Sequence, residues 1–562
     1  MSTFQQIVPA FSHLNVGWHS IKWDECHKRV RGLQIRIAKA TKDQQWRKVK
    51  SLQRMLVRSF SAKSVAVKRV TENTGKKTPG VDGETWSTPA EKWLAVSRLK
   101  RTGYKPKPLK RVNIPKQNGK TRPLGIPTML DRAMQALYLL ALEPVSETTA
   151  DRNSYGFRPM RSTADAIRQT HIVLCRWDTA EWILEGDIKG CFDNISHHWL
   201  LANIPMDKQI LSKWLNAGYM DKGQLNPTYA GTPQGGIISP VLANMALDGL
   251  EDELEAYFGE KSSREGKRNK INYVRYADDF VITGASRELL EGKVKPVVEA
   301  FMAERGLTLS VEKTKVTHIT EGFDFLGQNV RRFGRKVLVR PSKKNLASFL
   351  AKIRNMIKEN KAVPAWQMIR MLNPLIRGWV NYHRHVAAKE SFSYVDHHIW
   401  ASLWRWCVRR HPHQGKLWVK QKYFRRIATR DWYFSDQDPQ GKLVTLYKAD
   451  ETPIKRHVKI RGNANSYDPA DECYFEQRIE RVWRSTHQGK EKMRIIWQRQ
   501  QMKCPLCKQY ITHETGWHIH HIIERCRGGD DRQSNLAMLH PNCHRQLHSI
   551  VTGSRKGGLH EA

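Results

Sequence analysis

The sequence has few acidic residues, no long apolar run and no cysteine pattern typical of a disulfide framework. Its 562 residues include 95 lysines and arginines but only 54 aspartates and glutamates, which gives a formal net charge of +41. Such an excess predicts a polyanionic partner, because each phosphate contact releases counterions. A ribosomal-type structural protein would share this charge, but seldom this length or the 19 tryptophans.

Two further absences concern location. No apolar run approaches the length of a membrane span, and the N-terminus lacks the charged start and apolar core of a signal peptide. Four of the nine cysteines fall between Cys504 and Cys543 and the others are scattered, which favours a reducing compartment. We therefore expect a cytoplasmic protein without a membrane partner. The length predicts several domains of about 100–200 residues each.

Two acidic stretches indicate a metal site. Apolar residues flank Tyr276-Ala-Asp-Asp279, which predicts two strands joined by a tight turn, and an apolar strand from Trp182 ends at Asp187. A polymerase needs two divalent ions about 3.5–4 Å apart, and Mg²⁺ prefers carboxylate oxygens. Asp187 and Asp278 could supply them, with Asp279 alongside. The alternative for the hairpin is a surface turn, since aspartate is a common turn former.

Two longer strings extend the pattern. Gly231-Thr-Pro-Gln-Gly-Gly-Ile-Ile-Ser-Pro240 predicts a glycine turn that opens a helix over 237–250, and Leu372-Asn-Pro-Leu-Ile-Arg-Gly-Trp-Val-Asn-Tyr-His-Arg384 lies in a predicted helical bundle. With these motifs in this order, nearly the whole chain resembles the bacterial group II intron-encoded proteins. These are reverse transcriptase–maturases with a C-terminal HNH endonuclease.

The resemblance implies a multidomain α+β fold: a right-hand polymerase, with fingers, a palm that carries the catalytic β-hairpin and a helical thumb, plus a small zinc-bound ββα HNH domain. The expected domains are a basic helical N-terminal extension (1–66), reverse transcriptase fingers and palm (67–345), a maturase or thumb domain (346–425), a DNA-binding region (426–490) and the HNH endonuclease (491–562). The extension reads as amphipathic helices with a basic face, for which RNA contact and a merely solvated surface are the alternatives.

The resemblance also assigns roles in the polymerase site. Asp187, Asp278 and Asp279 would be catalytic, and two Mg²⁺ ions would be held by Asp187, Ile188, Asp278 and Asp279. The dNTP would contact Lys116, Arg122, Phe192, Gln234 and Lys313. Two of these lie in a basic hairpin over 104–127, whose Asn-Gly turn is a strong hairpin signal, although a solvated ribbon is the alternative. Phe192 would exclude a 2′-hydroxyl by its size, unless it is a core residue.

The predicted bundle over 346–425 carries cations and tryptophans. The resemblance implies intron-RNA contacts for Arg377, Arg384 and Lys389, and the exposed face of the second helix adds Arg405 and Arg409. We expect Trp400 and Trp404 to be core residues rather than platforms on which bases stack. Arg158, in a string further upstream, could contact template or primer, and a structural role is equally plausible.

The last module contains two residue pairs with metal-ligand spacing. Cys504-Pro-Leu-Cys507 and His540-Pro-Asn-Cys543 predict a structural zinc site, with Cys526 as an alternative fourth ligand. Between and after them lie His520-His521, Asn535, His544 and His548. By resemblance His520, His544 and His548 bind one divalent ion, His521 is the general base and Asn535 fixes its orientation. The alternative is a DNA-binding zinc knuckle that does not cleave.

The expected function has three parts: RNA-directed DNA synthesis from dNTPs, maturase binding of intron RNA that assists splicing and reverse splicing, and nicking of double-stranded target DNA to prime reverse transcription (retrohoming). A ribonucleoprotein associated with the nucleoid would result, of undetermined oligomeric state. The alternatives are a free-standing reverse transcriptase of a defence or diversity system, an RNA-binding splicing factor with a relic polymerase site, and a homing endonuclease. The thumb string and the HNH residues argue against the first, and the intact polymerase motifs argue against the other two.

Overall fold

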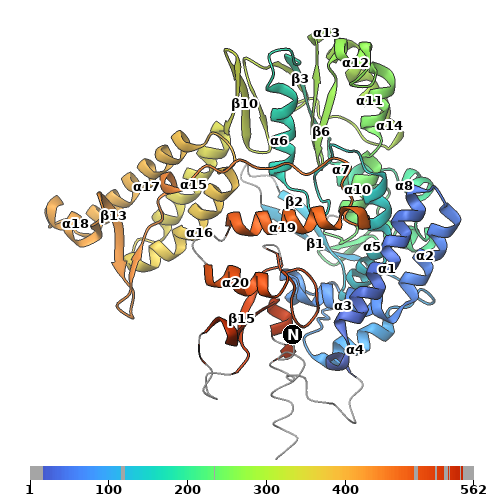
Figure 1. Ribbon diagram of the computed structural model, residues 1–562, viewed down its shortest axis with the longest axis horizontal. Coiled ribbons are helices and arrows are strands. Elements are labelled where there is room, and N and C mark those ends of the chain that lie inside the picture. Colours follow the sequence, from blue (N-terminus) through green and yellow to red (C-terminus); the bar gives the residue numbers. More distant parts are fainter. Residues whose placement is uncertain are drawn as a thin grey trace, which may run out of the picture.

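The computed structural model shows a mixed α/β protein of several domains (Figure 1). It describes residues 17–115, 121–232, 235–486, 491–512, 515–523, 530, 532–544 and 546–547. No helix within these residues combines the length and the apolar character that crossing a membrane requires.

Helices dominate the N-terminal part. α1 (Trp23–Lys42), α2 (Trp46–Arg58) and α3 (Phe60–Glu72) pack against the long buried helix α5 (Met129–Thr149). The apolar residues of each helix recur every three or four positions and face inward, and most lysines and arginines lie outside, with Lys68 of α3 and Arg132 of α5 as buried exceptions. The prediction of basic amphipathic helices is confirmed. The short helix α4 (Pro89–Arg98) follows and begins with a capping box between Thr88 and Glu91.

A four-stranded antiparallel sheet, called the central sheet below, has the strand order β6-β7-β3-β8. Its strands are β3 (Trp182–Asp187), β6 (Asn272–Tyr276), β7 (Asp279–Gly284) and β8 (Lys315–His318). The strands are rich in branched and aromatic residues, which suit a sheet that is covered on both faces. Gly186 is required by packing, since a Cβ there would lie 2.1 Å from the Phe280 ring. Both the predicted strand before Asp187 and the predicted hairpin are confirmed.

A second sheet has the order β2-β1-β4-β5 and contains the predicted basic hairpin. It consists of β1 (Leu109–Pro115), β2 (Thr121–Ile126), β4 (Tyr219–Asp221) and β5 (Gln224–Asn226). In sequence, α6 (Thr163–Leu174) precedes β3, and β3 and β4 are separated by α7 (Cys191–Asn194), α8 (His197–Asn203) and α9 (Lys208–Leu215). The guanidinium of Arg111 lies 4.0 Å from the centre of the Tyr219 ring and ties β1 to β4.

The helix that was predicted over 237–250 is interrupted. α10 (Ser239–Leu247) ends just before Asp248, and α11 (Leu250–Phe258) begins after Gly249, whose φ is +98°. The Gly249 amide donates to the Asp151 carboxylate at 2.8 Å, so a side-chain oxygen takes the place of the main-chain carbonyl that would accept in a continuous helix. The predicted C-terminal end was wrong, because a glycine with positive φ breaks the run.

The remaining elements between α11 and the helical bundle are mostly short. They are α12 (Arg264–Asn269), α13 (Arg287–Leu289), α14 (Lys295–Glu304), and a three-stranded sheet of β9 (Phe323–Phe325), β10 (Gln328–Phe333) and β11 (Lys336–Pro341). This sheet leads directly into the helical bundle.

The bundle contains α15 (Lys343–Glu359), α16 (Ala365–His383), α17 (Lys389–Arg410) and α18 (Lys416–Tyr423), followed by the sheet β12 (Phe424–Ile427), β13 (Arg430–Gln437) and β14 (Leu443–Thr445). Phe424 and Phe434 of the sheet share one buried core with Leu372 and Leu403 of the helices. The predicted domain boundary after residue 425 therefore crosses a continuous core, and the boundary stays a prediction.

A long segment then returns across the molecule to the N-terminal helices, and in Figure 1 the orange helix α19 (Glu472–Thr486) marks its path. Asp165 of α6 anchors it by accepting hydrogen bonds from His457 at 2.9 Å, the Ile460 amide at 2.8 Å and Arg478 at 2.7 Å. Burial raises the pKa of Asp165, but the His457 hydrogen bond and the Arg478 charge outweigh it and hold the pKa at about 2. The last module contains α20 (Glu491–Arg499), β15 (His518–His521) and β16 (Leu536–Leu539).

Candidate functional site

The central sheet brings the predicted carboxylates together. Asp187 at the end of β3 is paired directly with Asp279 at the start of β7, and Asp278 lies in the turn just before. Ile188 continues beyond β3 and forms a bridge to Leu309. Because an isoleucine side chain has no ligand atom, only the main-chain carbonyl of Ile188 could bind a metal ion. The three predicted carboxylates thus lie at one edge of the sheet, and their binding of metal ions stays a prediction.

A buried network holds the hairpin turn in place from behind. A Cβ on Gly156 would lie 2.3 Å from the Ala277 nitrogen, so the two loops touch backbone to backbone. The carbonyl of Gly156 accepts from the Asn244 side chain at 2.8 Å, and the fully buried Arg275 donates to Asn244 and to Asp248. These contacts make the turn a rigid support for Asp278.

The charges at the site favour a cation. Burial, which is the largest cause, and the charges of Asp278 and Asp187 together raise the pKa of Asp279 to about 6. Lys313 donates to both Asp187 oxygens, at 2.9 and 2.8 Å, and supplies one compensating charge. The predicted contact of Lys313 with a leaving pyrophosphate stays a prediction, since the structure shows only its ion pair with Asp187.

Phe192 lies beside a cavity of about 400 Å³. The ring is half-buried and meets Phe157 edge to face, with the ring centroids 6.2 Å apart. The loop of Gly231 closes the cavity on one side, because the Gly231 amide donates to Ile195 at 2.8 Å and the Thr232 amide donates to Phe192 at 2.6 Å. Phe192 is thus neither a fully buried core residue nor a freely exposed one.

The other predicted dNTP contacts are only partly visible. Arg122 is exposed on β2, opposite Ile114 of β1, at the end of the basic hairpin. Lys116 and Gln234 lie outside the described residues. Arg158 has a structural role: it is buried, and its guanidinium donates to the Glu147 carboxylate at 2.8 Å. Because the Arg158 guanidinium is buried and paired with Glu147, it does not face nucleic acid.

The five predicted RNA contacts in the bundle differ in their surroundings. Arg377 stacks over Tyr447 at 5.0 Å, and Lys389 donates to the Asp450 carbonyl at 2.6 Å. Arg384 is half-buried, and burial lowers its pKa. Arg405 and Arg409 are exposed and lie one turn apart on α17, as expected for a binding face. Their RNA contacts stay predictions.

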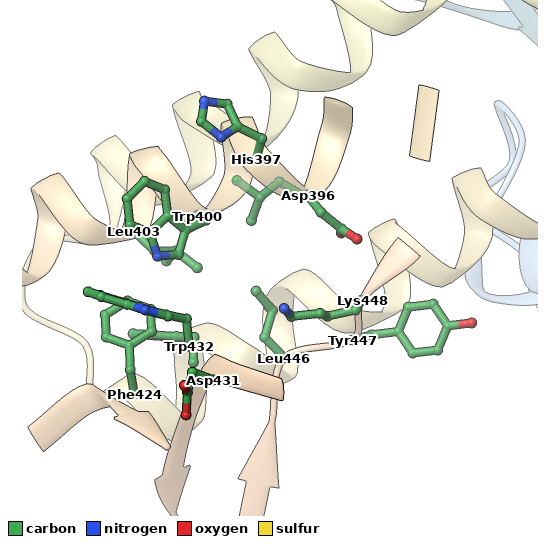
Figure 2. A pocket seen from close by; sticks show the side chains of 12 residues that line it. Asp396, His397, Trp400, Leu403, Phe424, Asp431, Trp432, Leu446, Tyr447 and Lys448 are labelled. Carbon is green, nitrogen blue, oxygen red and sulfur yellow. The ribbon is translucent and has the colours of Figure 1, made fainter. Parts of the chain in front are cut away.

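Trp400 and Trp404 are half-buried. Trp400 lines a cavity of about 350 Å³ between α17 and the sheet β12–β14 (Figure 2). Trp432 approaches Trp400 with ring centroids 5.6 Å apart and Trp404 at 5.4 Å. The expectation that these tryptophans are core residues holds only in part, because both rings pack against the core but are only partly buried, and Trp400 also faces the cavity.

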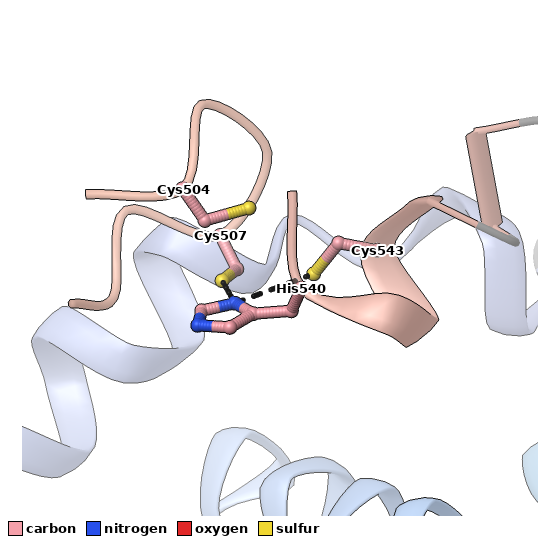
Figure 3. Close-up of side chains that lie close together, drawn as sticks. All are labelled: Cys504, Cys507, His540 and Cys543. Carbon is pink, nitrogen blue, oxygen red and sulfur yellow. Dashed lines mark hydrogen bonds between the residues drawn. The ribbon is translucent and has the colours of Figure 1, made fainter. Parts of the chain in front are cut away.

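The zinc ligands predicted from spacing converge in space (Figure 3). The ligand atoms of Cys504, Cys507, His540 and Cys543 all lie within 4.8 Å of one another. His540 donates through Nε2 to the Tyr510 carbonyl at 3.0 Å, which leaves Nδ1 facing the sulfur atoms, 3.3 Å from Cys507 Sγ. The alternative ligand Cys526 lies outside the described residues. Three thiols and an oriented imidazole fit a tetrahedral zinc ion.

The predicted nuclease residues lie in the same module, with His520 and His521 on β15, Asn535 just before β16 and His544 in a helical turn after β16. His520 of β15 is buried, and its ring centroid lies 5.4 Å from that of His544. The Asn535 side chain accepts from the Ile523 amide at 2.7 Å and donates to the Ile523 carbonyl at 3.1 Å, so it fixes the chain just beyond His521. His548 lies outside the described residues, and within them only the cysteine–histidine set brings three or more ligand atoms together.

One residue was missed by the sequence analysis. His518 lies two positions before His520 on β15, so the two rings share a face of the strand, and the His518 centroid is 5.3 Å from that of His544. The alternation of His518 and His520 along a strand was the signal that could have found it. His521 faces the opposite side.

Four protein-family descriptions match successive parts of the chain. "N-terminal domain of reverse transcriptase" matches residues 18–99, and "Reverse transcriptase (RNA-dependent DNA polymerase)" matches residues 114–330. "Group II intron, maturase-specific domain" matches residues 346–424, and "HNH endonuclease" matches residues 504–549.

Similar proteins agree with these matches. "Group II intron-encoded protein LtrA" of Lactococcus lactis subsp. cremoris is 26% identical over 80% of this chain and 94% of its own length. The chain belongs to the group II intron-encoded proteins. "Protein YkfC" of Escherichia coli K12 is 35% identical over 46% of this chain and 77% of its own length. An "Uncharacterized 91 kDa protein in cob intron" of Schizosaccharomyces pombe is 28% identical over 68% of this chain and 57% of its own length.

The family explains the arrangement of sites in this intron-encoded protein. Its reverse transcriptase and HNH endonuclease domains indicate RNA-directed DNA polymerase and nuclease activity, and both domain types depend on metal ions in general. Its maturase-specific domain, residues 346–424, implies binding of intron RNA.

Proposed function

We propose that the protein is a right-hand polymerase and maturase that copies its own intron RNA into target DNA by retrohoming. The pairing of Asp187 with Asp279, beside Asp278, carries this proposal, because it puts three carboxylates at one edge of the central sheet. In this proposal the sheets around the acidic site are fingers and palm, and the helical bundle is the thumb.

The residues in and around the acidic site would have separate roles in nucleotide addition. Asp187, Asp278, Asp279 and the Ile188 carbonyl would hold two Mg²⁺ ions, which clamp the 3′-hydroxyl and the leaving phosphate. Phe192 would lie under the sugar and exclude a 2′-hydroxyl by contact. Arg122, with Lys116 and Gln234, would hold the triphosphate and base, since arginine grips phosphate through two hydrogen bonds.

The proposed nuclease site nicks double-stranded DNA to make the primer. His520, His544 and His548 would hold one divalent ion, His521 would take the proton from water, and Asn535 would keep His521 in position through the chain beyond it. Zinc at Cys504, Cys507, His540 and Cys543 would hold the module together, since so small a module has little core of its own.

Basic surfaces support binding of intron RNA. A cavity of about 740 Å³ beside α2 is lined by several cations, namely Lys50, Arg54, Arg58, Lys100 and Lys208. Only one carboxylate, Asp207, lines the same cavity, and it is paired with Arg101. Together with Arg405 and Arg409 on α17, these cations suit phosphate contacts from the N-terminal extension and the thumb.

The test of the maturase role is splicing of a transcript that contains the gene's own flanking intron, at a Mg²⁺ concentration too low for the RNA alone. We expect ligated exons only when protein is present. The variant Asp278→Ala serves as the control that separates activities: it should splice like the wild type and make no cDNA. Primer extension without any stimulation of splicing would favour a free-standing reverse transcriptase instead, and cDNA synthesis by Asp278→Ala would refute the metal assignment.

A further inference from the structure

The cysteine–histidine cluster does not face solvent but the N-terminal helices. In Figure 1 the red C-terminal module lies against the blue helices, and in Figure 3 pale blue helices run beside the four ligands. Buried residues of α1 and α3, such as Trp23 and Val67, belong to the same continuous core as Trp497 and Cys543. The two ends of the chain therefore form one packed unit.

A buried cation lies at the centre of this contact. Lys68 of α3 is only 8% exposed, and its Nζ donates to Cys543 Sγ at 3.9 Å. The same ammonium lies 4.5 Å from the centre of the Trp23 ring. One helical turn further, the Glu72 carboxylate accepts a hydrogen bond from the Asn542 side chain, next to Cys543. Two polar side chains of α3 thus reach the zinc-ligand segment.

Charge balance explains why a lysine is buried there. A zinc ion with three thiolates and one neutral imidazole has one net negative charge, and a buried charge is costly unless it is paired. Lys68 supplies the opposite charge, from a part of the chain that contributes no ligand. The reverse also holds, since without the metal-bound thiolate Lys68 would be a buried cation whose remaining carboxylate neighbour is Glu72.

We propose that the zinc centre is also a docking site: its anionic thiolate shell, paired with Lys68, holds the endonuclease module against the N-terminal helices. Apolar packing alone is incomplete here, because a cleft of about 500 Å³ opens beside Lys68, between Trp86 and Asn542. Loading of zinc would then set the position of the nuclease relative to the polymerase. The inference rests on the proposed zinc occupancy of the site.

The test compares the full-length wild type with Lys68→Met, which keeps the shape of the side chain and removes its charge. The matched control is Lys28→Met, on an exposed position of α1. For each protein we would measure zinc content by elemental analysis and hydrogen–deuterium exchange in α3, before and after zinc is removed with a chelator. The exchange readout requires no activity.

In the wild type, zinc removal should speed exchange in α3 by about tenfold or more, which corresponds to ~1.4 kcal/mol. Zinc-loaded Lys68→Met should already exchange at the faster rate, whereas Lys28→Met should match the wild type. If Lys68→Met does not fold, the comparison of the wild type with and without chelator still tests whether zinc holds the module against α3. Wild-type α3 that exchanges equally with and without zinc overturns docking and leaves the zinc site intact. A wild type that contains no zinc overturns both.

Discussion

Gly231 offers a test of how the polymerase site is built, because the three atoms nearest to a Cβ placed there would all be main-chain atoms. It has a φ of +84°, and a Cβ there would lie 2.5 Å from the Phe192 carbonyl oxygen and 2.6 Å from the Asp193 carbonyl carbon. Ordinary Cβ contacts are 3.4–4 Å. Gly231→Ala must therefore move the loop or the Phe192 turn, since neither neighbour is a flexible side chain.

Gly223 is the matched control, since its φ of +87° is nearly the same and a Cβ there would meet nothing within 4 Å. Both alanine variants carry the backbone strain of the left-handed region, about 1–2 kcal/mol. Only Gly231→Ala adds the displacement of Phe192. A shift of roughly 1 Å at a positioning residue can lower a rate by about 100-fold.

The measurement is incorporation of a single dNTP on a primed RNA template, with thermal unfolding of both variants as a check on folding. We expect kcat/KM to fall by roughly 10- to 100-fold in Gly231→Ala and by less than about threefold in Gly223→Ala. Equal activity of the two variants would refute the argument that Gly231 positions the Phe192 turn.

Three further predictions concern Phe192, His521 and Asp165. Phe192→Ala should raise ribonucleotide incorporation relative to dNTP incorporation, and an unchanged ratio would make Phe192 a packing residue. His521→Ala should stop nicking of the second DNA strand and leave primer extension unchanged; loss of both activities would show that the modules depend on each other. At neutral pH, Asp165→Asn should lower the free energy of opening of residues 457–478 by about 2 kcal/mol, so that hydrogen exchange there becomes faster. Since the pKa of Asp165 falls from 3.8 to about 2 on folding, its contribution is present above about pH 4 and is lost as pH falls toward 2, so the difference between variant and wild type should shrink over that interval. A difference that persists unchanged at pH 2 would contradict this assignment.

Local patterns predicted the elements of the acidic site well. The strand before Asp187 and the hairpin around Asp278 were correct because apolar runs and a turn between them are encoded within a few residues. The zinc pairs were found for the same reason, since ligands three residues apart are a local pattern. The match of 114–330 and 346–424 to family descriptions agrees with the motifs found there.

Contacts between distant segments could not be predicted in this way. Gly249 breaks the predicted helix because Asp151 accepts from its amide, about a hundred residues away in sequence. The sequence offered two roles for Arg158, and the tertiary structure decided between them by burying Glu147 beside it.

By itself, then, the sequence determined which residues could bind metal ions and in which element each one lies, since turns, strand periods and ligand spacings depend on near neighbours along the chain. Only the tertiary structure showed that the His540 ring lies among the three cysteine sulfur atoms and that Lys68 pairs with Cys543. Those choices depend on which charges become buried together, and burial is a property of the packed molecule rather than of any stretch of its sequence.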